Sequence, residues 1–381
     1  MKTIFRPILF ALCLLVTAPC VTSGQTRLEE PLTFISADSV VVWGGDFSDL
    51  RGMAFIVDQT LEERPVKVNP ANYEADLAKW QNDWLPTMTA TGAGGFDART
   101  SRAVRNSQMI EQAAALFLQT GHADFMEGIE RALFNDQLHE VLTNTEAGVT
   151  FDKRMAAQSL VNGLGMVYAY KGTDVWVNFF LNNTAHIRTP EYNLILDQIT
   201  SMPFNTTMKV RVNGIPRGGF YMRFHLRIPY WSEAQGFPKG RYTLTGEVPA
   251  ERPKVYVNGR DPLKVKYEDG YLIIDRKWNR GDEILVYFPL NAQYLQRAGG
   301  GNTDVAVQSG PLIYSVPDSC DRGLVDPAVP MTIDYDNSGY PIFRGTYATK
   351  NYLTGLPLTF TALPYLRSEG RVWLPTTGSS R

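Results

Sequence analysis

The sequence has little cysteine, with three in 381 residues. Two of them, Cys13 and Cys20, lie in a leader segment that we expect to be removed, which leaves Cys320 alone in the mature chain. A lone cysteine excludes an internal disulfide and a cysteine-based metal cage. The four histidines, at positions 122, 139, 186 and 225, have no ligand spacing. The composition therefore predicts no metal site.

An excess of charge of one sign is also lacking. Lys and Arg number 37 against 39 Asp and Glu, which gives a net charge of −2. Because no basic stripe stands out, a nucleic-acid partner held through its phosphates is not expected. Aromatic residues reach 12%, and glycine and proline are frequent. This balance favours a β-rich protein, and it suits a carbohydrate as partner because sugar sites stack aromatic rings on the ligand.

Long hydrophobic runs are absent apart from one near the start. Lys2 and Arg6 precede the apolar run Ile8–Val16, and small residues follow at Thr22–Gly24. This order predicts a signal peptide over residues 1–24 and an exported protein, periplasmic or extracellular. A lipoprotein anchored at Cys20 is less favoured because Pro19 precedes that cysteine. The apolar run is too short to span a membrane, and no later stretch is long enough.

The apolar residues of 72–170 follow a helical period. Tyr73, Leu77, Trp80 and Trp84 recur at spacings of four, three and four, and Pro86 follows them. Further helices are predicted over about 102–119, from about 123, and over about 154–170. Thr120-Gly121 is a typical helix stop. These helices pack as hairpins, but they are too few to close a ring of helical hairpins.

From Lys171 the period becomes two. In Met222–Ile228 the apolar and polar residues alternate, which is typical of a half-buried antiparallel strand. Asn258-Gly259 and Asp269-Gly270 are hairpin turns between such strands. The sequence thus predicts an α+β fold in five parts. These are the signal peptide 1–24, an N-terminal β or irregular segment 25–71, a helical region 72–170, a β-sandwich 171–295 and a C-terminal β module 296–381.

Several motifs occur in an order and spacing found together in one enzyme family. Downstream they are Leu226–Trp231, Val257–Gly259, Gly270–Trp278, Val305–Tyr314, Leu358–Tyr365 and Arg371–Pro375, and upstream they are Glu130–Asn135 and Val167–Tyr170. From about Tyr73 to Pro375 the chain resembles glycoside hydrolase family 127, the β-L-arabinofuranosidases. The upstream motifs resemble the last helices of that family's catalytic barrel, so the helical region is expected to be a truncated α/α barrel.

The resemblance implies a barrel of paired helices followed by β domains, and removal of arabinofuranose from plant glycans with retention of configuration. It further implies a cysteine nucleophile held on a zinc ion, with a glutamate as acid/base. A zinc-bound thiolate is ionised at neutral pH and can form the glycosyl-enzyme intermediate that a carboxylate forms in other glycosidases.

This chain departs from the family at those residues. Where the resemblance places a Glu-x-Cys ligand motif, the sequence has Arg102 and Val104, and where it places two adjacent cysteines, the sequence has Phe151 and Asp152. Because arginine, valine and phenylalanine do not bind zinc, the family's zinc site is not retained and no cofactor is expected. The loop from Thr91 also shortens the segment that holds the acid/base glutamate.

Two carboxylates lie near these segments. Asp97, in the glycine-rich loop, and Asp152, before a helix, are candidate catalytic residues, since glycosidases use a carboxylate pair. Both are also ordinary choices for a turn and a helix N-terminus. For substrate binding the candidates are Tyr230, Trp231 and Trp84, although Trp84 shares its helix stripe with Leu77 and Trp231 fits a core position.

Two functions remain open from the sequence. The first is a divergent exported hydrolase of the arabinofuranosidase type. The second is a non-catalytic carbohydrate-binding or structural protein built from the same parts. A partner chain or a second copy could complete the truncated barrel.

Overall fold

The computed structural model describes residues 26–36, 39–41, 60–93, 100–143, 148–204, 207–245, 252–262, 264–289, 292–299 and 303–378. The expected signal peptide and Asp97 lie outside these ranges. No helix within them is long and apolar enough to cross a membrane.

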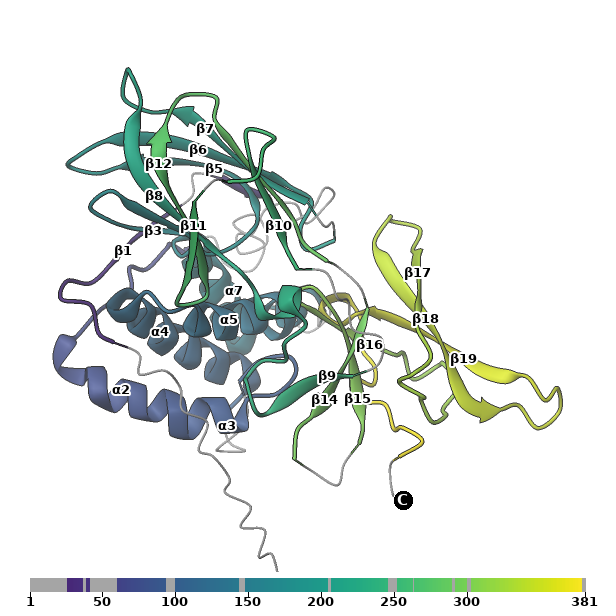
Figure 1. The fold of residues 1–381 in the computed structure, drawn as a ribbon. Helices are drawn as coiled ribbons and strands as arrows, with labels where there is room; N and C mark the ends of the chain where they lie inside the picture. The colour runs from purple at the N-terminus through teal and green to yellow at the C-terminus, as the bar shows by residue number, and fades with distance from the viewer. Residues whose placement is uncertain are drawn as a thin grey trace, which may run out of the picture.

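The helices form one layer of the molecule (Figure 1). In chain order they are η1 (Pro70–Asn72), α2 (Tyr73–Lys79), the π-helical turn η2 (Trp80–Trp84), α3 (Leu85–Thr87), α4 (Arg102–Thr120), α5 (Ala123–Arg131), the π-helical turn η3 (Ala132–Gln137), α6 (Leu138–Leu142) and α7 (Phe151–Leu164). Helix α4 ends at Gly121, whose φ of 71° is the left-handed conformation that glycine adopts without strain. The expected stop at Thr120-Gly121 is therefore confirmed.

Two six-stranded sheets lie against each other above the helices (Figure 1). The first, sheet A, has the order β1 (Thr33–Ile35), β3 (Tyr168–Lys171), β4 (Asp174–Val177), β8 (Phe220–Arg227), β12 (Tyr271–Trp278) and β11 (Val265–Glu268). The second, sheet B, has the order β10 (Lys254–Val257), β13 (Glu283–Tyr287), β7 (Thr207–Gly214), β6 (Asn193–Thr200), β5 (Asn182–Arg188) and β2 (Ser39–Val41). The expected α+β class with an antiparallel sandwich is confirmed, although β4 and β8 run parallel.

A seven-stranded sheet C makes up the C-terminal part. Its order is β17 (Thr332–Tyr335), β18 (Pro341–Lys350), β19 (Pro357–Pro364), β16 (Leu312–Ser315), β15 (Val305–Ser309), β14 (Gln293–Arg297) and β9 (Tyr242–Thr245). Two short 3-10 turns, η5 (Tyr230–Glu233) and η6 (Tyr365–Arg367), follow β8 and β19. Strand β9 lies within residues 171–295, the segment that the sequence assigns to the sandwich, but it pairs in sheet C. The order of the strands along the chain therefore does not tell which sheet each one joins.

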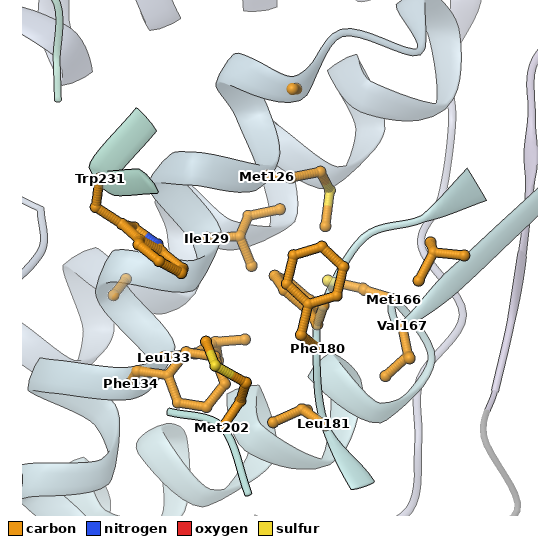
Figure 2. Close-up of a cluster of buried hydrophobic side chains, with 14 of the residues drawn as sticks. Met126, Ile129, Leu133, Phe134, Met166, Val167, Phe180, Leu181, Met202 and Trp231 are labelled. Carbon is orange, nitrogen blue, oxygen red and sulfur yellow. The ribbon is translucent and has the colours of Figure 1, made fainter. Parts of the chain in front are cut away.

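One hydrophobic core joins the helices to the sandwich. The apolar stripe of the third predicted helix, Phe125, Ile129, Leu133 and Leu138, is buried. Figure 2 shows Met126, Ile129 and Leu133 facing Met166 and Phe180 from the sandwich side. The stripe thus lies in a core shared with the sandwich, and within the helical layer Phe125 packs against Trp80 and Leu133 lies close to Gly163 of α7.

Strand β8 shows where sequence periodicity is insufficient. Met222, Phe224 and Leu226 face the core as the alternation predicts. On the other face Arg223 is exposed, but His225 and Arg227 are buried. The His225 ring stacks on Trp176 of β4 at 4.0 Å, and Arg227 is covered by Glu127 and Glu130 of α5. The strand is therefore half-buried at its start and buried on both faces at its end.

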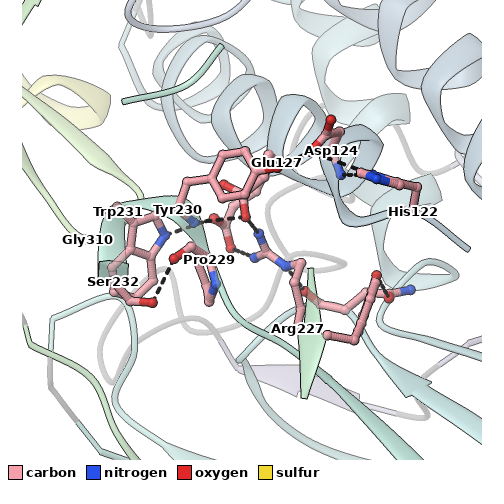
Figure 3. A network of polar contacts seen from close by, with 12 residues as sticks. His122, Asp124, Glu127, Arg227, Pro229, Tyr230, Trp231, Ser232 and Gly310 are labelled. Carbon is pink, nitrogen blue, oxygen red and sulfur yellow. Dashed lines mark hydrogen bonds and ion pairs between the residues drawn. The ribbon is translucent and has the colours of Figure 1, made fainter. Parts of the chain in front are cut away.

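The buried Arg227 fastens α5 to the sandwich (Figure 3). Its Nη1 lies 2.5 Å from Glu127 Oε1, its Nη2 donates to Glu130, and its Nε donates to the Asn178 carbonyl at 2.6 Å. The Trp231 indole N–H donates to Glu130 Oε2 at 3.1 Å. A buried cation with two carboxylates is thus satisfied on all sides, which suits a structural rather than a ligand-binding role.

Burial in this network raises the pKa of Glu127 to about 7, and the nearby Glu130 carboxylate adds to the rise while Arg227, the Tyr230 N–H and Arg131 oppose it. The folded state therefore binds more protons than the unfolded state between about pH 4.5 and 7. We expect the contribution of Glu127 to the free energy of unfolding to fall as pH rises through this window. Denaturant melts at several pH values should show a flatter profile for Glu127→Gln than for the wild type. An identical profile in the variant would contradict the assignment.

Candidate functional site

The N-termini of α4 and α7 meet at one point on the helical layer. Ser101 Oγ donates to Asp152 Oδ1 at 2.6 Å and also accepts the Val104 N–H as the N-cap of α4. Thr150 caps α7 by accepting the Lys153 N–H at 3.1 Å. The two caps fix the N-termini of α4 and α7. The hydrogen bond from Ser101 to Asp152 joins one helix end to the other.

The guanidinium of Arg102 lies beside this junction. Its Nη1 donates to the Tyr365 hydroxyl at 2.5 Å and lies 3.5 Å from Asp136 Oδ1, while its side chain is 56% exposed. Tyr365 belongs to η6, and its ring stacks on His139 at 4.2 Å. Burial raises the pKa of Tyr365 to about 12, so the hydroxyl stays protonated at neutral pH. The C-terminal part of the chain thus contributes one side of this site.

Asp136 is the buried carboxylate of the site. Its Oδ2 accepts from Asn106 Nδ2 at 3.0 Å, whereas among the residues that the structure describes its Oδ1 has no hydrogen bond and lies 3.5 Å from Arg102 Nη1. A Cβ on Gly92 would lie 2.5 Å from Asp136 Oδ2 and from Asn106 Oδ1. Glycine at position 92 is therefore required for the loop to pack on this carboxylate.

An exposed aromatic ring completes the site. Phe151, the first residue of α7, is 69% exposed, and Val149 beside it is also exposed. Asp152 follows directly and is half-buried. The exposed ring and the carboxylate are adjacent residues of α7, and the Ser101–Asp152 hydrogen bond ties this helix end to the α4 end, where Arg102 follows Ser101. An aromatic ring can cover the apolar face of a hydroxyl-rich ligand, and charged groups can bond its hydroxyls.

The aromatic residues chosen from the sequence lie elsewhere. Trp84 is buried and donates to Gln112 Oε1 at 2.5 Å. Tyr230 and Trp231 are both 5% exposed, with the tyrosine hydroxyl on Asp124 and the indole on Glu130. Because all three rings are in the core, none of them presents a face on which a sugar could stack. Their expected sugar contacts stay a prediction. Of the catalytic candidates, Asp152 is at the site.

The sequence interpretation missed Phe151 and Asp136 as functional candidates. Phe151 was noted only as a position where a cysteine was expected. The sequence does contain a signal for Phe151. It directly follows the N-cap Thr150, so it lies at the end of the helix and ahead of the apolar stripe that faces the core. No sequence signal singles out Asp136, whose environment depends on Asn106 and Gly92.

The residues at the expected zinc-ligand positions do not fit a zinc ion. Of Arg102, Val104, Phe151 and Asp152, only the aspartate can coordinate a metal. In the part of the chain that the structure describes, no three His, Cys, Asp or Glu side chains gather as a metal ion requires.

Comparison with known proteins identifies relatives of this fold. Residues 174–290 match the family model described as "Beta-L-arabinofuranosidase, GH127 middle domain". A solved GH127 β-arabinofuranosidase is similar with a TM-score of 0.67 and 21% identity, over 87% of this chain and 60% of the other. A GH127 β-L-arabinofuranosidase from Geobacillus stearothermophilus T6 has a TM-score of 0.60 and 16% identity, over 86% and 59%.

A structure titled glycoside hydrolase has a TM-score of 0.60 and 16% identity, over 76% of this chain and 59% of its own. No curated protein matches by sequence. The chain thus spans about 60% of the length of the solved structures that it matches.

Proposed function

Since this chain carries the GH127 middle domain within the fold of GH127 proteins, we propose that it is an exported protein that binds arabinofuranose-containing glycans without cleaving them. The names of its relatives supply the ligand class. The single observation that supports binding is the exposed ring of Phe151 beside Asp152, at the point where Ser101 joins the ends of α4 and α7.

The proposed function does not use a cysteine thiolate as nucleophile. The family resemblance requires cysteines where this chain has Val104, Phe151 and Asp152. At the position where the resemblance places the motif's glutamate, the guanidinium of Arg102 supplies a fixed positive charge, held by Asp136 and Tyr365. A guanidinium donates hydrogen bonds but does not act as a nucleophile, because it stays protonated.

The three groups divide the binding between them. The ring of Phe151 stacks on the C–H face of the furanose. Asp152, oriented by Ser101, accepts hydrogen bonds from ring hydroxyls, and Arg102 donates to a hydroxyl or ring oxygen from its exposed edge.

Hydrolysis by carboxylates is the second candidate, and one observation favours it. Asp136 Oδ1 is buried without a hydrogen bond, and Asp136 and Asp152 flank the Ser101–Arg102 corner. In that case one carboxylic acid would protonate the leaving oxygen and the other carboxylate would act as nucleophile or base. Release of free arabinose from an aryl β-L-arabinofuranoside, abolished by Asp152→Asn, would establish this function instead.

Replacing Phe151 by alanine should weaken glycan binding by about fivefold, because an aromatic face contributes roughly 1 kcal/mol. Isothermal titration with an arabinofuranose oligosaccharide measures the change in Kd. Tyr352→Ala is the matched control, since this tyrosine is exposed at a distant hairpin of sheet C and should leave Kd unchanged. An unchanged Kd for the Phe151 variant would place the binding site elsewhere.

A further inference from the structure

A cavity of about 280 Å³ lies at the C-terminal ends of α4 and α7. Its walls come from β1, from residues 63–68 and from the last turns of the two helices. Six of the residues that line it are apolar: Leu32, Phe34, Val66, Val68, Leu118 and Met166. Because α7 has 14 residues, about 20 Å separates this cavity from the proposed glycan site at the opposite helix ends.

Asn162 lines the cavity with an amide that is bonded on one side only. The residue is 9% exposed, and its Oδ1 accepts from the Arg64 N–H and from Gln158 Nε2, both at 2.9 Å. These two donors fix the orientation of the amide, so its NH₂ group points the other way. Among the residues that the structure describes, this NH₂ group has no hydrogen bond. A buried donor of this kind is satisfied by an acceptor on a ligand.

The carboxylate of Glu63 places negative charge at the same cavity. It accepts a hydrogen bond from the Ser36 hydroxyl and lies so close to Gly165 that a Cβ there would collide with its Oε1. The C-terminal ends of α4 and α7 add the partial negative charge of their helix dipoles. This side of the cavity therefore favours an ammonium group.

Arg64, the next residue along the chain, also lines the cavity. It is exposed, and its guanidinium has no ion pair with any residue that the structure describes. Together with the Asn162 NH₂ group it supplies donors that suit a carboxylate. The lining therefore combines an acceptor for a cation, donors for an anion and a largely apolar wall.

We propose that this cavity binds an apolar α-amino acid as its zwitterion. The ammonium group bonds Glu63 at the helix ends, the carboxylate bonds Asn162 and Arg64, and the side chain packs on Phe34 and Leu118. The volume is near the lower limit of ligand pockets, roughly 300 Å³, so a single amino acid fits better than a longer ligand. The proposal does not depend on glycan binding at the other helix ends.

Isothermal titration of the full chain with L-leucine tests the ligand class. L-leucine should bind saturably at one site, and both L-leucinamide and N-acetyl-L-leucine should bind about tenfold more weakly or not at all, because each lacks one of the two charges. All three measurements use the wild-type protein, so they do not depend on whether a variant folds. Absence of L-leucine binding, or equal binding of either analogue, would overturn the proposal.

Two nearly isosteric variants test the residues. Glu63→Gln removes the negative charge, and Asn162→Asp keeps the Oδ1 acceptor but replaces the NH₂ group by an oxygen that repels a carboxylate. Each should weaken L-leucine binding by about tenfold. Glu62→Gln is the matched control, since Glu62 is exposed and does not line the cavity, and its affinity should equal that of the wild type. Wild-type affinity in Glu63→Gln would place the amino acid elsewhere and overturn the assignment.

Discussion

Replacing Arg227 by alanine is expected to lower the free energy of unfolding by about 3–5 kcal/mol. The guanidinium is fully buried between Glu127 and Glu130, and its loss leaves two carboxylates in the core without their cation. It also removes the hydrogen bond from β8 to the carbonyl of Asn178, the residue that follows β4. Urea denaturation followed by circular dichroism measures the change.

The control for Arg227 is an exposed ion pair of the same sheet. Lys266 Nζ lies 2.7 Å from Glu268 Oε2, and both side chains are largely in solvent. Lys266→Ala should change the free energy of unfolding by less than about 1 kcal/mol. If Arg227→Ala cost no more than this control, the buried network would not hold the helices on the sandwich.

Truncation of Trp80 to alanine is expected to cost about 3–5 kcal/mol, the range for large core aromatics. The indole is completely buried, and its ring lies 5.2 Å from that of Phe125. A Cβ on Gly128 would lie 2.6 Å from the indole Cη2, so α5 approaches the ring as closely as glycine allows. The cavity left by the indole therefore opens between α2, η2 and α5.

Thermal melts of Trp80→Ala and Leu353→Ala give the comparison. Leu353 is exposed at the β18–β19 hairpin, so its truncation should shift the free energy by about 0.5 kcal/mol or less. A small effect at Trp80 would mean that the helical layer contributes little to the folded state. The expected large effect would show that the packing of η2 on α5 contributes to the stability of the folded chain.

Local chemistry made part of the fold predictable from sequence. The left-handed Gly121 ends α4, and Asp269-Gly270 has positive φ in the hairpin turn between the paired strands β11 and β12. Asn258-Gly259 also has positive φ, but the expected hairpin is not formed there, because β10 and β11 belong to different sheets. The alternation of Met222–Leu226 identified the core face of β8. Each of these signals depends on a few neighbouring residues. The family resemblance, which rested on several such motifs in order, is confirmed by the comparisons.

The candidate site was less predictable because it depends on distant residues. Asp136, Arg102 and Tyr365 meet only once η6 docks on α6. Likewise, Tyr230 and Trp231 are buried because α5 supplies Asp124 and Glu130 to their polar atoms. Periodicity gives the face of a strand or helix but not which element covers it, so exposed and buried aromatics could not be told apart.

We propose that the joined ends of α4 and α7 bind an arabinofuranose glycan and leave it intact. The most direct measurement is a titration of the protein with a β-L-arabinofuranosyl oligosaccharide, monitored by NMR signals of the sugar. Our account predicts saturable line broadening that Phe151→Ala weakens, with the oligosaccharide recovered unchanged after long incubation. Signals of free arabinose that accumulate beyond one equivalent per chain would show a hydrolase and contradict it.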